Sequence, residues 1–165
     1  MHPERSRGRR WILSSKDESR EAAVAIAALA KRSLAILTPD LEAGIYDHYD
    51  FLEVAKRLVL SKPYAKIRMI VSDPQRAIRH GNQFIGMGRR LNTYIEIRNA
   101  HADYRGHREA FLIADDFALL YRVDSARWEG IADSYDPVVT RRYLDFFEGI
   151  WNVSEPGSEF REVHI

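Results

Sequence analysis

Residues 33–71, SLAILTPDLEAGIYDHYDFLEVAKRLVLSKPYAKIRMIV, decide the fold of this chain. The stretch begins with Ser33–Thr38, a short apolar run of the kind that forms a buried strand. Asp50 and Glu53 have the spacing of a helix cap, and the run FLEVAKRLVLS that starts directly after Asp50 is typical of a helix. Lys66–Val71 then alternates polar and apolar residues as a strand does. The stretch therefore predicts a strand, a helix and a second strand.

The residues before this stretch extend the same rhythm toward the N-terminus. Arg10–Ser14 (RWILS) is typical of a short strand, and Ser15 with Glu18 has the spacing of a capping box that begins a helix. The alanine-rich run EAAVAIAALAKR favours a helix and allows it to pack closely on a sheet. Together these residues predict the order β-α-β-α-β.

A less regular helix is expected after the third strand. Asp73 provides a cap before Pro74 at the first helical position, and the helix runs toward Arg90. Glycine weakens a helix, and this one has to accommodate Gly81, Gly86 and Gly88. A further strand is predicted at Tyr94–Arg98.

The second half of the chain is richer in strand. Glu109–Ala114 and Phe117–Arg122 are typical of two strands joined by a tight turn at Asp115-Asp116. Asp136 then caps a last helix with a broad apolar face, which has to dock on the sheet. The predicted fold class is α/β, with three α/β/α layers around one mixed sheet.

Length and composition limit the classes of protein. The 165 residues suit one domain, expected over residues 11–152, between a flexible basic tail (1–10) and a C-terminal tail (153–165). The chain has no cysteine, which excludes disulfides, thiolate metal sites and thiol nucleophiles. No apolar run approaches the roughly 20 residues that span a bilayer, and no secretory signal is visible, so we expect a soluble, cytoplasmic protein. With 25 basic and 24 acidic residues, net charge does not favour a polyanionic partner.

Two stretches carry a resemblance to a known family. HREAFLIADDFALLYR (107–122) and DPVVTRRYLDFFEGIW (136–151), in this order of elements, resemble one half of the phospholipase D superfamily. Phe147 and Trp151 match the Phe-x-x-x-Trp that often ends the last helix of that family. The chain is also similar to an uncharacterised bacterial domain that occurs alone or behind acetyltransferase domains, although no acetyl-coenzyme A motif is visible. The resemblance implies a phospholipase D-like fold.

The catalytic motif of that superfamily is not intact here. The motif runs histidine, any residue, lysine, four residues, aspartate, and a Gly-Ser pair follows on the next strand. If Asp115 takes the aspartate place, Arg108 and Ala110 stand at the histidine and lysine places. If His107 takes the histidine place instead, Glu109 replaces the lysine. Both registers lose the lysine that holds the phosphoryl oxygens, so the motif argues against hydrolysis.

These observations predict a non-catalytic phospholipase D-like domain that binds a small anionic ligand or a protein partner, as a homodimer. We expect no cofactor and no metal, since the histidines lack metal-ligand spacing. Candidate ligand-binding residues are His107, Arg108, Asp115, Arg122, Asp40 and Arg98. Ordinary structural roles stay open beside this one, because adjacent aspartates between strands are common turn residues and Asp40 can end a strand.

Two other functions stay open. A nucleic-acid-binding module would use the basic segment from Arg76 to Arg98, which has no acidic residue between Pro74 and Ile95. Its contact residues would be Arg76, Arg79, Arg89 and Arg90. The segment matches neither a dinucleotide fingerprint nor a Walker loop, so a solvated face on a loose helix is the preferred explanation. The third function is a divergent phosphodiesterase.

Overall fold

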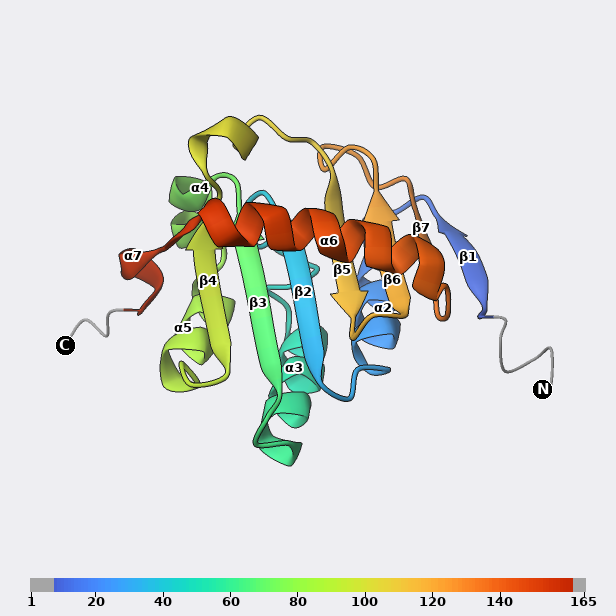
Figure 1. The fold of residues 1–165 in the computed structure, drawn as a ribbon, viewed down its shortest axis with the longest axis horizontal. Helices are drawn as coiled ribbons and strands as arrows, with labels where there is room; N and C mark the ends of the chain where they lie inside the picture. The colour runs from blue at the N-terminus through green and yellow to red at the C-terminus, as the bar shows by residue number, and fades with distance from the viewer. Residues whose placement is uncertain (1–7, 162–165) are drawn as a thin grey trace.

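An eight-stranded mixed sheet forms the centre of the protein in this computed structural model, which describes residues 8–161 (Figure 1). Its strands are β1 (Arg10–Leu13), β2 (Ser33–Thr38), β3 (Lys66–Val71), β4 (Ile95–Asn99), β5 (Ala110–Ala114), β6 (Ala118–Arg122), β7 (Gly130–Asp133) and β8 (Glu155–Pro156). They lie in the order β1-β7-β6-β5-β2-β3-β4-β8. The neighbours β2, β3 and β4 are parallel, and the remaining pairs are antiparallel.

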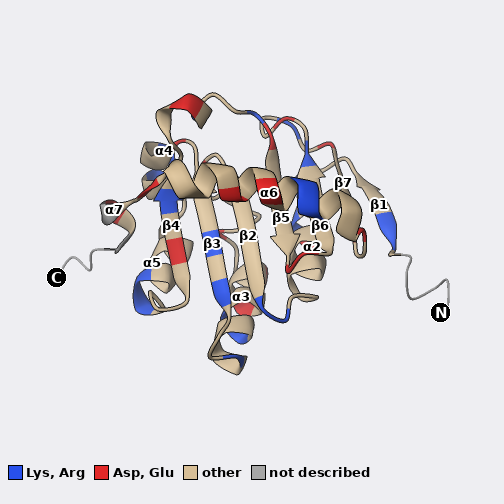
Figure 2. Cartoon of the chain, viewed as in Figure 1, with Lys and Arg blue, Asp and Glu red and all other residues tan. Residues whose placement is uncertain are grey.

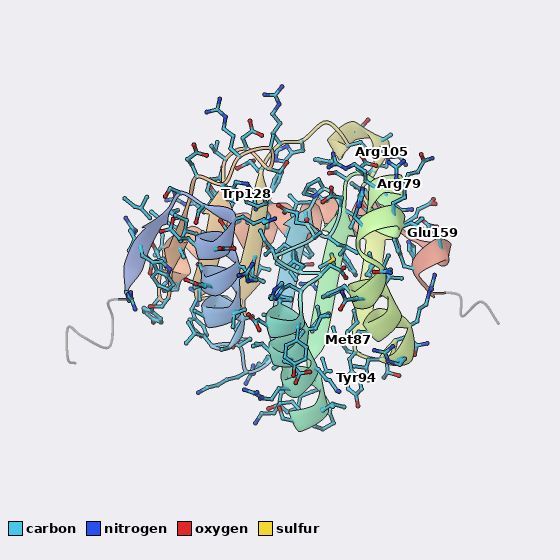
Figure 3. The ribbon with its side chains drawn as sticks, turned by 180° about the vertical axis from the view of Figure 1, so that it is seen from behind. Arg79, Met87, Tyr94, Arg105, Trp128 and Glu159 are labelled. Carbon is cyan, nitrogen blue, oxygen red and sulfur yellow. The ribbon has the colours of Figure 1, made fainter. Side chains whose placement is uncertain are left out.

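Helices cover both faces of this sheet. They are α2 (Lys16–Ala27), α3 (Tyr49–Ser61), α4 (Pro74–His80), α5 (Asn82–Arg90), the 3-10 turn η1 (Ala102–Tyr104), α6 (Pro137–Val153) and α7 (Ser158–Arg161). Figure 1 shows α6 crossing one face, and Figure 3 shows α2, α3 and α5 on the other. The predicted α/β class with three layers is therefore confirmed.

The core is divided by the sheet into two clusters. Alternate residues of β2 point to opposite faces, so Leu34 and Ile36 join the cluster under α2 and α3, while Leu37 joins the one under α6. Because β2 is buried on both faces, its sequence is a continuous apolar run instead of an alternating one. This run is what made the segment recognisable as a strand.

The helix starts show one correct prediction and one error. Ser15 caps α2, and its hydroxyl oxygen accepts a hydrogen bond from the backbone N–H of Glu18 at 3.1 Å. The predicted cap of α3 at Asp50 is wrong, because α3 begins at Tyr49 and His48 is its N-cap. The His48 ring Nδ1 accepts from the Asp50 N–H at 3.2 Å. Histidine is an uncommon cap, so the sequence signal pointed to the next acidic residue.

The loosened helix after Asp73 is divided into α4 and α5 at Gly81. A Cβ atom at Gly81 would lie 2.2 Å from Cδ1 of Leu41, so only glycine allows the loop after β2 to approach this closely. The break therefore positions α4 against that loop, beside the candidate site described below.

Two short strands near the edges of the sheet, β7 and β8, have no pattern in the sequence that predicts a strand. β7 lies between β1 and β6, and β8 pairs with β4. β8 and α7 fall within residues 153–165, which the sequence assigned to a C-terminal tail. Phe160 is nevertheless buried in the core, so the described part of that stretch belongs to the domain. Residues 1–7 of the predicted basic tail lie outside the described residues. None of the helices in residues 8–161 is long and apolar enough to cross a membrane.

Candidate functional site

One edge of the sheet collects the loops that carry most of the polar side chains. The parallel strands β2, β3 and β4 end at this edge. Strand β6 also ends here, because β5 is antiparallel to β2 and β6 is antiparallel to β5. Ala110 at the start of β5 lies opposite Arg122 at the end of β6. Loops that follow the carboxyl ends of strands are where open α/β sheets bind ligands. We call this side of the sheet the motif edge.

A buried ion pair between Glu42 and Arg122 lies at the motif edge. The side chains are only 5% and 3% exposed, and Nη2 of Arg122 donates to Oε2 of Glu42 at 2.5 Å. The same nitrogen donates to the Ser125 carbonyl at 2.9 Å, and the guanidinium lies 4.9 Å from the ring centre of Trp128. Thr38 donates its hydroxyl to the other Glu42 oxygen at 3.0 Å. The charge of Arg122 is therefore already neutralised inside the protein.

The protonation of Glu42 reflects two opposing effects. Burial raises the pKa of the Glu42 carboxyl above its ordinary value, and the positive charge of Arg122 opposes that rise. Because a guanidinium stays charged at any physiological pH, it favours the ionised carboxylate beside it. The charge of each partner in the Glu42–Arg122 pair is therefore stabilised by the charge of the other.

The loop that carries Glu42 has an unusual backbone. Leu41 and Glu42 have positive φ angles of 69° and 37°, although neither is glycine. Oδ1 of Asp40 accepts from the Glu42 N–H at 3.0 Å, and Leu41 is completely buried, which together hold this conformation. Such strained residues persist where the surrounding structure requires them, and they concentrate at functional sites.

A pocket of about 520 Å³ opens beside the ion pair. Its walls come from the loop after β2, from α4 and from the loop after β6, and its lining residues are Pro39, Asp40, Glu42, Ala43, Arg76, His80, Ser125, Ala126 and Trp128. Arg76 reaches it from α4, with Nε 3.1 Å from Oδ2 of Asp40. The terminal nitrogens of Arg76 donate no hydrogen bond within residues 8–161, and His80 on the same helix is exposed. We call this cavity the motif-edge pocket; Figure 3 labels Trp128 in its wall.

A second polar cluster lies on the opposite face of the sheet, under α6. Nε2 of His107 is 2.6 Å from Oε1 of Glu109, and Tyr121 donates its hydroxyl to the other oxygen of Glu109. The His107 ring lies 5.0 Å from the ring of Phe146. Burial, followed by the hydrogen bonds to Glu109 and Tyr143, raises the pKa of Tyr121. Tyr121 and Arg122 are adjacent on β6, so their side chains point to opposite faces of the sheet. Because His107 lies with Glu109 and Tyr121, it does not share a site with Arg122.

The six residues predicted to bind a ligand are divided among several places. Asp40 and Arg122 come together at the motif-edge pocket, whereas His107 lies under α6. Arg108 is exposed, with its Nη1 4.0 Å from Asp124. Asp115 lies in the turn at the far end of the sheet, where its carboxylate accepts backbone N–H groups of residues 31–33.

Arg98 contacts Glu96 on its own strand, β4, and Trp151 on α6. Its Nε donates to Glu96 at 2.6 Å, its Nη1 donates to the Trp151 carbonyl at 2.8 Å, and its guanidinium lies 4.0 Å from the Trp151 ring centre. These contacts join β4 to the end of α6. The arginine therefore serves packing, and it is not part of the motif-edge pocket.

The four arginines of the predicted nucleic-acid surface are also separated. Arg76 and Arg79 lie on α4, close to the motif edge. Arg89 on α5 donates to the Glu159 carbonyl at 2.6 Å, and Arg90 lines a groove between α3 and α5. On the face seen in Figure 2, acidic and basic residues alternate over the described strands and α6 without a continuous basic stripe.

Sequence reasoning missed Glu42 and Trp128. Glu42 follows a buried strand by a few residues, which is a weak signal shared by many loops. Trp128 stands in a loop without a functional motif, and its ring packs against the Arg122 guanidinium. The site is identified by the contacts that Glu42 and Trp128 make with Arg122, which lies 80 positions after Glu42.

Several solved structures share this fold at low sequence identity. The phospholipase D family member Nuc from Salmonella typhimurium is 14% identical with a TM-score of 0.65, over 94% of this chain and 99% of that one. NucT from Helicobacter pylori is 14% identical with a TM-score of 0.64, over 91% and 99% of the two chains. The archaeal chromatin protein TrmBL2, described with a novel mode of DNA binding, is 15% identical with a TM-score of 0.63, over 90% of this chain and 54% of that one.

These likenesses establish a phospholipase D-like fold, and at such identities they establish the fold alone. Among curated proteins, none matches the sequence. The one family assignment comes from residues 15–163, which match the family described as a domain of unknown function, DUF7931. Since that match spans most of the 165 residues, the chain belongs to the DUF7931 family.

Proposed function

We propose that this domain is a non-catalytic relative of the phospholipase D fold that binds a small phosphate-like anion in the motif-edge pocket. The observation that carries the proposal is the buried Glu42–Arg122 pair, whose neutralised charges lie beside the motif-edge pocket. The pocket beside it is open and has a basic wall on α4.

The arrangement lacks what phosphoryl transfer requires. Catalysis needs a positioned nucleophile and positive groups that stabilise the charge of the transition state. Ala110, opposite Arg122 in the register, supplies neither, and the Arg122 charge is already balanced by Glu42. His107 is on the other face, with Nε2 engaged by Glu109. Binding an anion in the ground state demands less than this, because it needs only favourable charge and hydrogen-bond donors.

Arg76 and His80 are the groups that support anion binding. The Arg76 guanidinium is oriented by Asp40 through Nε, which leaves its terminal nitrogens available for phosphate oxygens. Asp40 also repels an incoming anion, so we expect modest affinity. Nucleic-acid binding is the weaker alternative, because its four arginines do not form one surface.

Arg76→Ala is expected to weaken the binding of inorganic pyrophosphate about tenfold or more, because a charge-assisted hydrogen bond to an anion is lost. Isothermal titration calorimetry on the purified chain measures this. Arg142→Ala is the matched control, since Arg142 is exposed on α6 and outside the pocket. If wild type shows no pyrophosphate binding at low salt, or if Arg76→Ala binds as well as wild type, the anion site is wrong.

The same preparation is expected to show no turnover of a chromogenic phosphodiester above the buffer rate. Lipid and oligonucleotide substrates extend the assay to the classes that phospholipase D-like folds cleave. Turnover in wild type that His107→Ala abolishes would overturn the non-catalytic assignment and favour the divergent phosphodiesterase.

We also propose that the chain forms a homodimer, with the outer edge of β1 as its contact. β1 is the terminal strand of the sheet, and its Ile12 side chain is 81% exposed. An edge strand with an exposed apolar side chain favours pairing with a second chain. Light scattering over a range of concentrations is expected to give the dimer mass for wild type and the monomer mass for Ile12→Lys. Leu60→Lys, an exposed residue on α3, is the control, and a constant monomer mass in wild type contradicts the dimer.

A further inference from the structure

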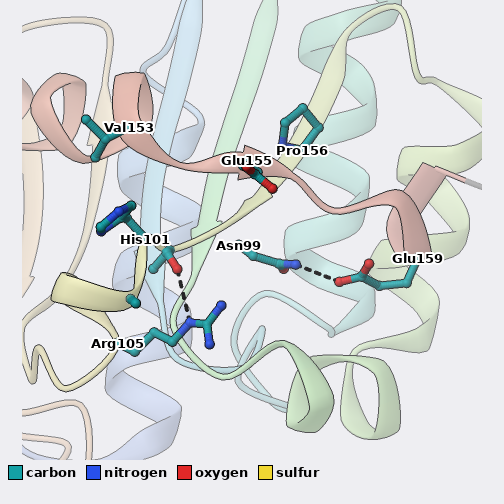
Figure 4. A pocket seen from close by; sticks show the side chains of 9 residues that line it. Asn99, His101, Arg105, Val153, Glu155, Pro156 and Glu159 are labelled. Atoms are coloured by element: carbon teal, nitrogen blue, oxygen red, sulfur yellow. Dashed lines mark hydrogen bonds between the residues drawn. The ribbon is translucent and has the colours of Figure 1, made fainter.

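A second pocket, of about 340 Å³, lies at the other end of the motif edge (Figure 4). It is enclosed by the end of β4, the turn η1 and the C-terminal segment that holds β8 and α7. Its lining residues are Asn99, Ala100, His101, Ala102, Arg105, Val153, Glu155, Pro156 and Glu159. It shares no residue with the motif-edge pocket, and we call it the C-terminal pocket.

Side chains of both charge signs line the C-terminal pocket. Nε of Arg105 donates to the Ala100 carbonyl at 3.3 Å, which orients the guanidinium. Its terminal nitrogens donate no hydrogen bond, and Arg105 forms no ion pair with a carboxylate, within residues 8–161. On the C-terminal segment, Oε1 of Glu159 accepts from Nδ2 of Asn99 at 2.7 Å. Figure 4 shows Asn99 between the Arg105 guanidinium and Glu159 in that view.

Glu155 adds a second carboxylate on the same side as Glu159. It is carried by β8, which pairs with β4, so the sheet sets its position relative to Asn99. Glu155 has no hydrogen-bond or ion-pair partner for its side chain in the described part of the chain. An isolated carboxylate and an isolated guanidinium that line one cavity attract groups of both signs. Val153 and Pro156 provide an apolar wall between the polar groups.

We propose that the C-terminal pocket binds a small amino-acid-like zwitterion, a molecule with one carboxylate and one primary ammonium group. The carboxylate is held by the terminal nitrogens of Arg105, a fork that matches its two oxygens. The ammonium lies toward Glu155, which accepts its hydrogen bonds. The apolar wall at Val153 and Pro156 contacts a short aliphatic side chain.

The composition of the pocket disfavours ligands with a single charge. A simple anion is attracted by Arg105 but repelled by Glu155, whereas a simple cation is attracted by Glu155 but repelled by Arg105. A zwitterion avoids both penalties because each of its ends meets the opposite charge. This site is independent of the anion site, since it uses none of the same residues.

Thermal unfolding of the purified chain in the presence of L-alanine or L-valine tests the proposal. Binding to the native state raises the unfolding temperature as the ligand concentration increases, whereas acetate and methylammonium at equal concentration are expected to leave it unchanged. Calorimetry then gives the affinity of the better amino acid. Arg105→Gln and Glu155→Gln are each expected to weaken it about tenfold or more, since each removes a charge-assisted hydrogen bond.

Two controls separate this pocket from the rest of the surface. Arg142→Gln removes an exposed arginine from α6 and is expected to retain the wild-type affinity. Arg76→Ala, which tests the motif-edge pocket, is expected to leave amino-acid binding unchanged. The proposal is overturned if no amino acid stabilises wild type, if acetate binds as well as alanine, or if both glutamine variants keep full affinity.

Discussion

Arg122→Ala is expected to lower the free energy of unfolding by about 3–5 kcal/mol, the loss seen when one partner of a buried ion pair is removed. The substitution leaves the Glu42 carboxylate buried with only the Thr38 hydroxyl as a hydrogen-bond donor among the described side chains. It also removes the guanidinium from the Trp128 ring and from the Ser125 carbonyl. Guanidinium chloride unfolding at neutral pH measures the loss.

A double variant distinguishes the cost of an unpaired charge from the value of the pair itself. Glu42→Leu with Arg122→Met replaces both charges by apolar groups of similar size, and we expect it to recover most of the lost stability. Arg108→Ala is the control, because that side chain is 80% exposed and its loss is expected to change stability by at most about 0.5 kcal/mol. An Arg122→Ala loss below about 1 kcal/mol would show that the pair is solvated and would remove the basis for a closed motif edge.

Phe147→Ala is expected to lower the free energy of unfolding by about 3–5 kcal/mol, because it creates a cavity under α6, the helix that crosses one face of the sheet. The Phe147 side chain is fully buried, its ring stacks on Trp151 at 5.8 Å, and it lies 6.5 Å from Phe111 of β5. The guanidinium of Arg68 on β3 lies 5.1 Å from the same ring. One side chain therefore joins α6 to two strands.

Chemical unfolding of the Phe147→Ala chain checks this value. Val138→Ala is the matched control on the same helix, because Val138 is 64% exposed and its truncation is expected to change stability by at most about 0.5 kcal/mol. Equal losses in the two variants would contradict the docking of α6 described here. Since α6 also covers the His107–Glu109–Tyr121 cluster, the Phe147→Ala chain is expected to expose that cluster more readily to solvent.

The proposed binding function is compatible with a phospholipase D-like fold, because a fold and the chemistry it carries depend on different residues. The sheet and α6 are held by apolar contacts such as those of Phe111 and Phe147, which resemble the family in sequence. In the resemblance, the chemistry depends on a few polar positions, which hold Arg108 and Ala110 in one register and His107 and Glu109 in the other. Changes at such positions leave the apolar core intact.

The parts of the fold that could be predicted from sequence are those encoded by short-range patterns. The apolar run of β2, the alternation of β3, the Ser15 cap of α2 and the Asp136 cap of α6 each depend on neighbouring residues only. Strands β7 and β8 were missed for the same reason. β7 and β8 are short and lack a strong sequence pattern. They form strands because neighbouring strands provide hydrogen-bond partners for their backbones. The α3 cap at His48 was missed because histidine rarely has that role.

The candidate site could be predicted only in part. Asp40 was singled out from its place after a strand and Arg122 from its place near the Gly-Ser pair of the resemblance; Asp40 lines the motif-edge pocket and Arg122 adjoins it. Asp115 was assigned to the same group because the superfamily motif joins it to Arg108 in sequence. A strand of five residues separates them, so they lie at opposite ends of β5.

The sequence by itself determined the α/β class and the three layers, because periodicity and caps are local properties. Tertiary structure alone decided which polar groups meet. Glu42 finds Arg122 across 80 positions, and Arg105 faces Glu155 across a pocket that exists only once β8 has paired with β4. Such pairings follow from strand order and loop conformation, including the positive φ angles of Leu41 and Glu42, and these are set by the packing of the whole chain.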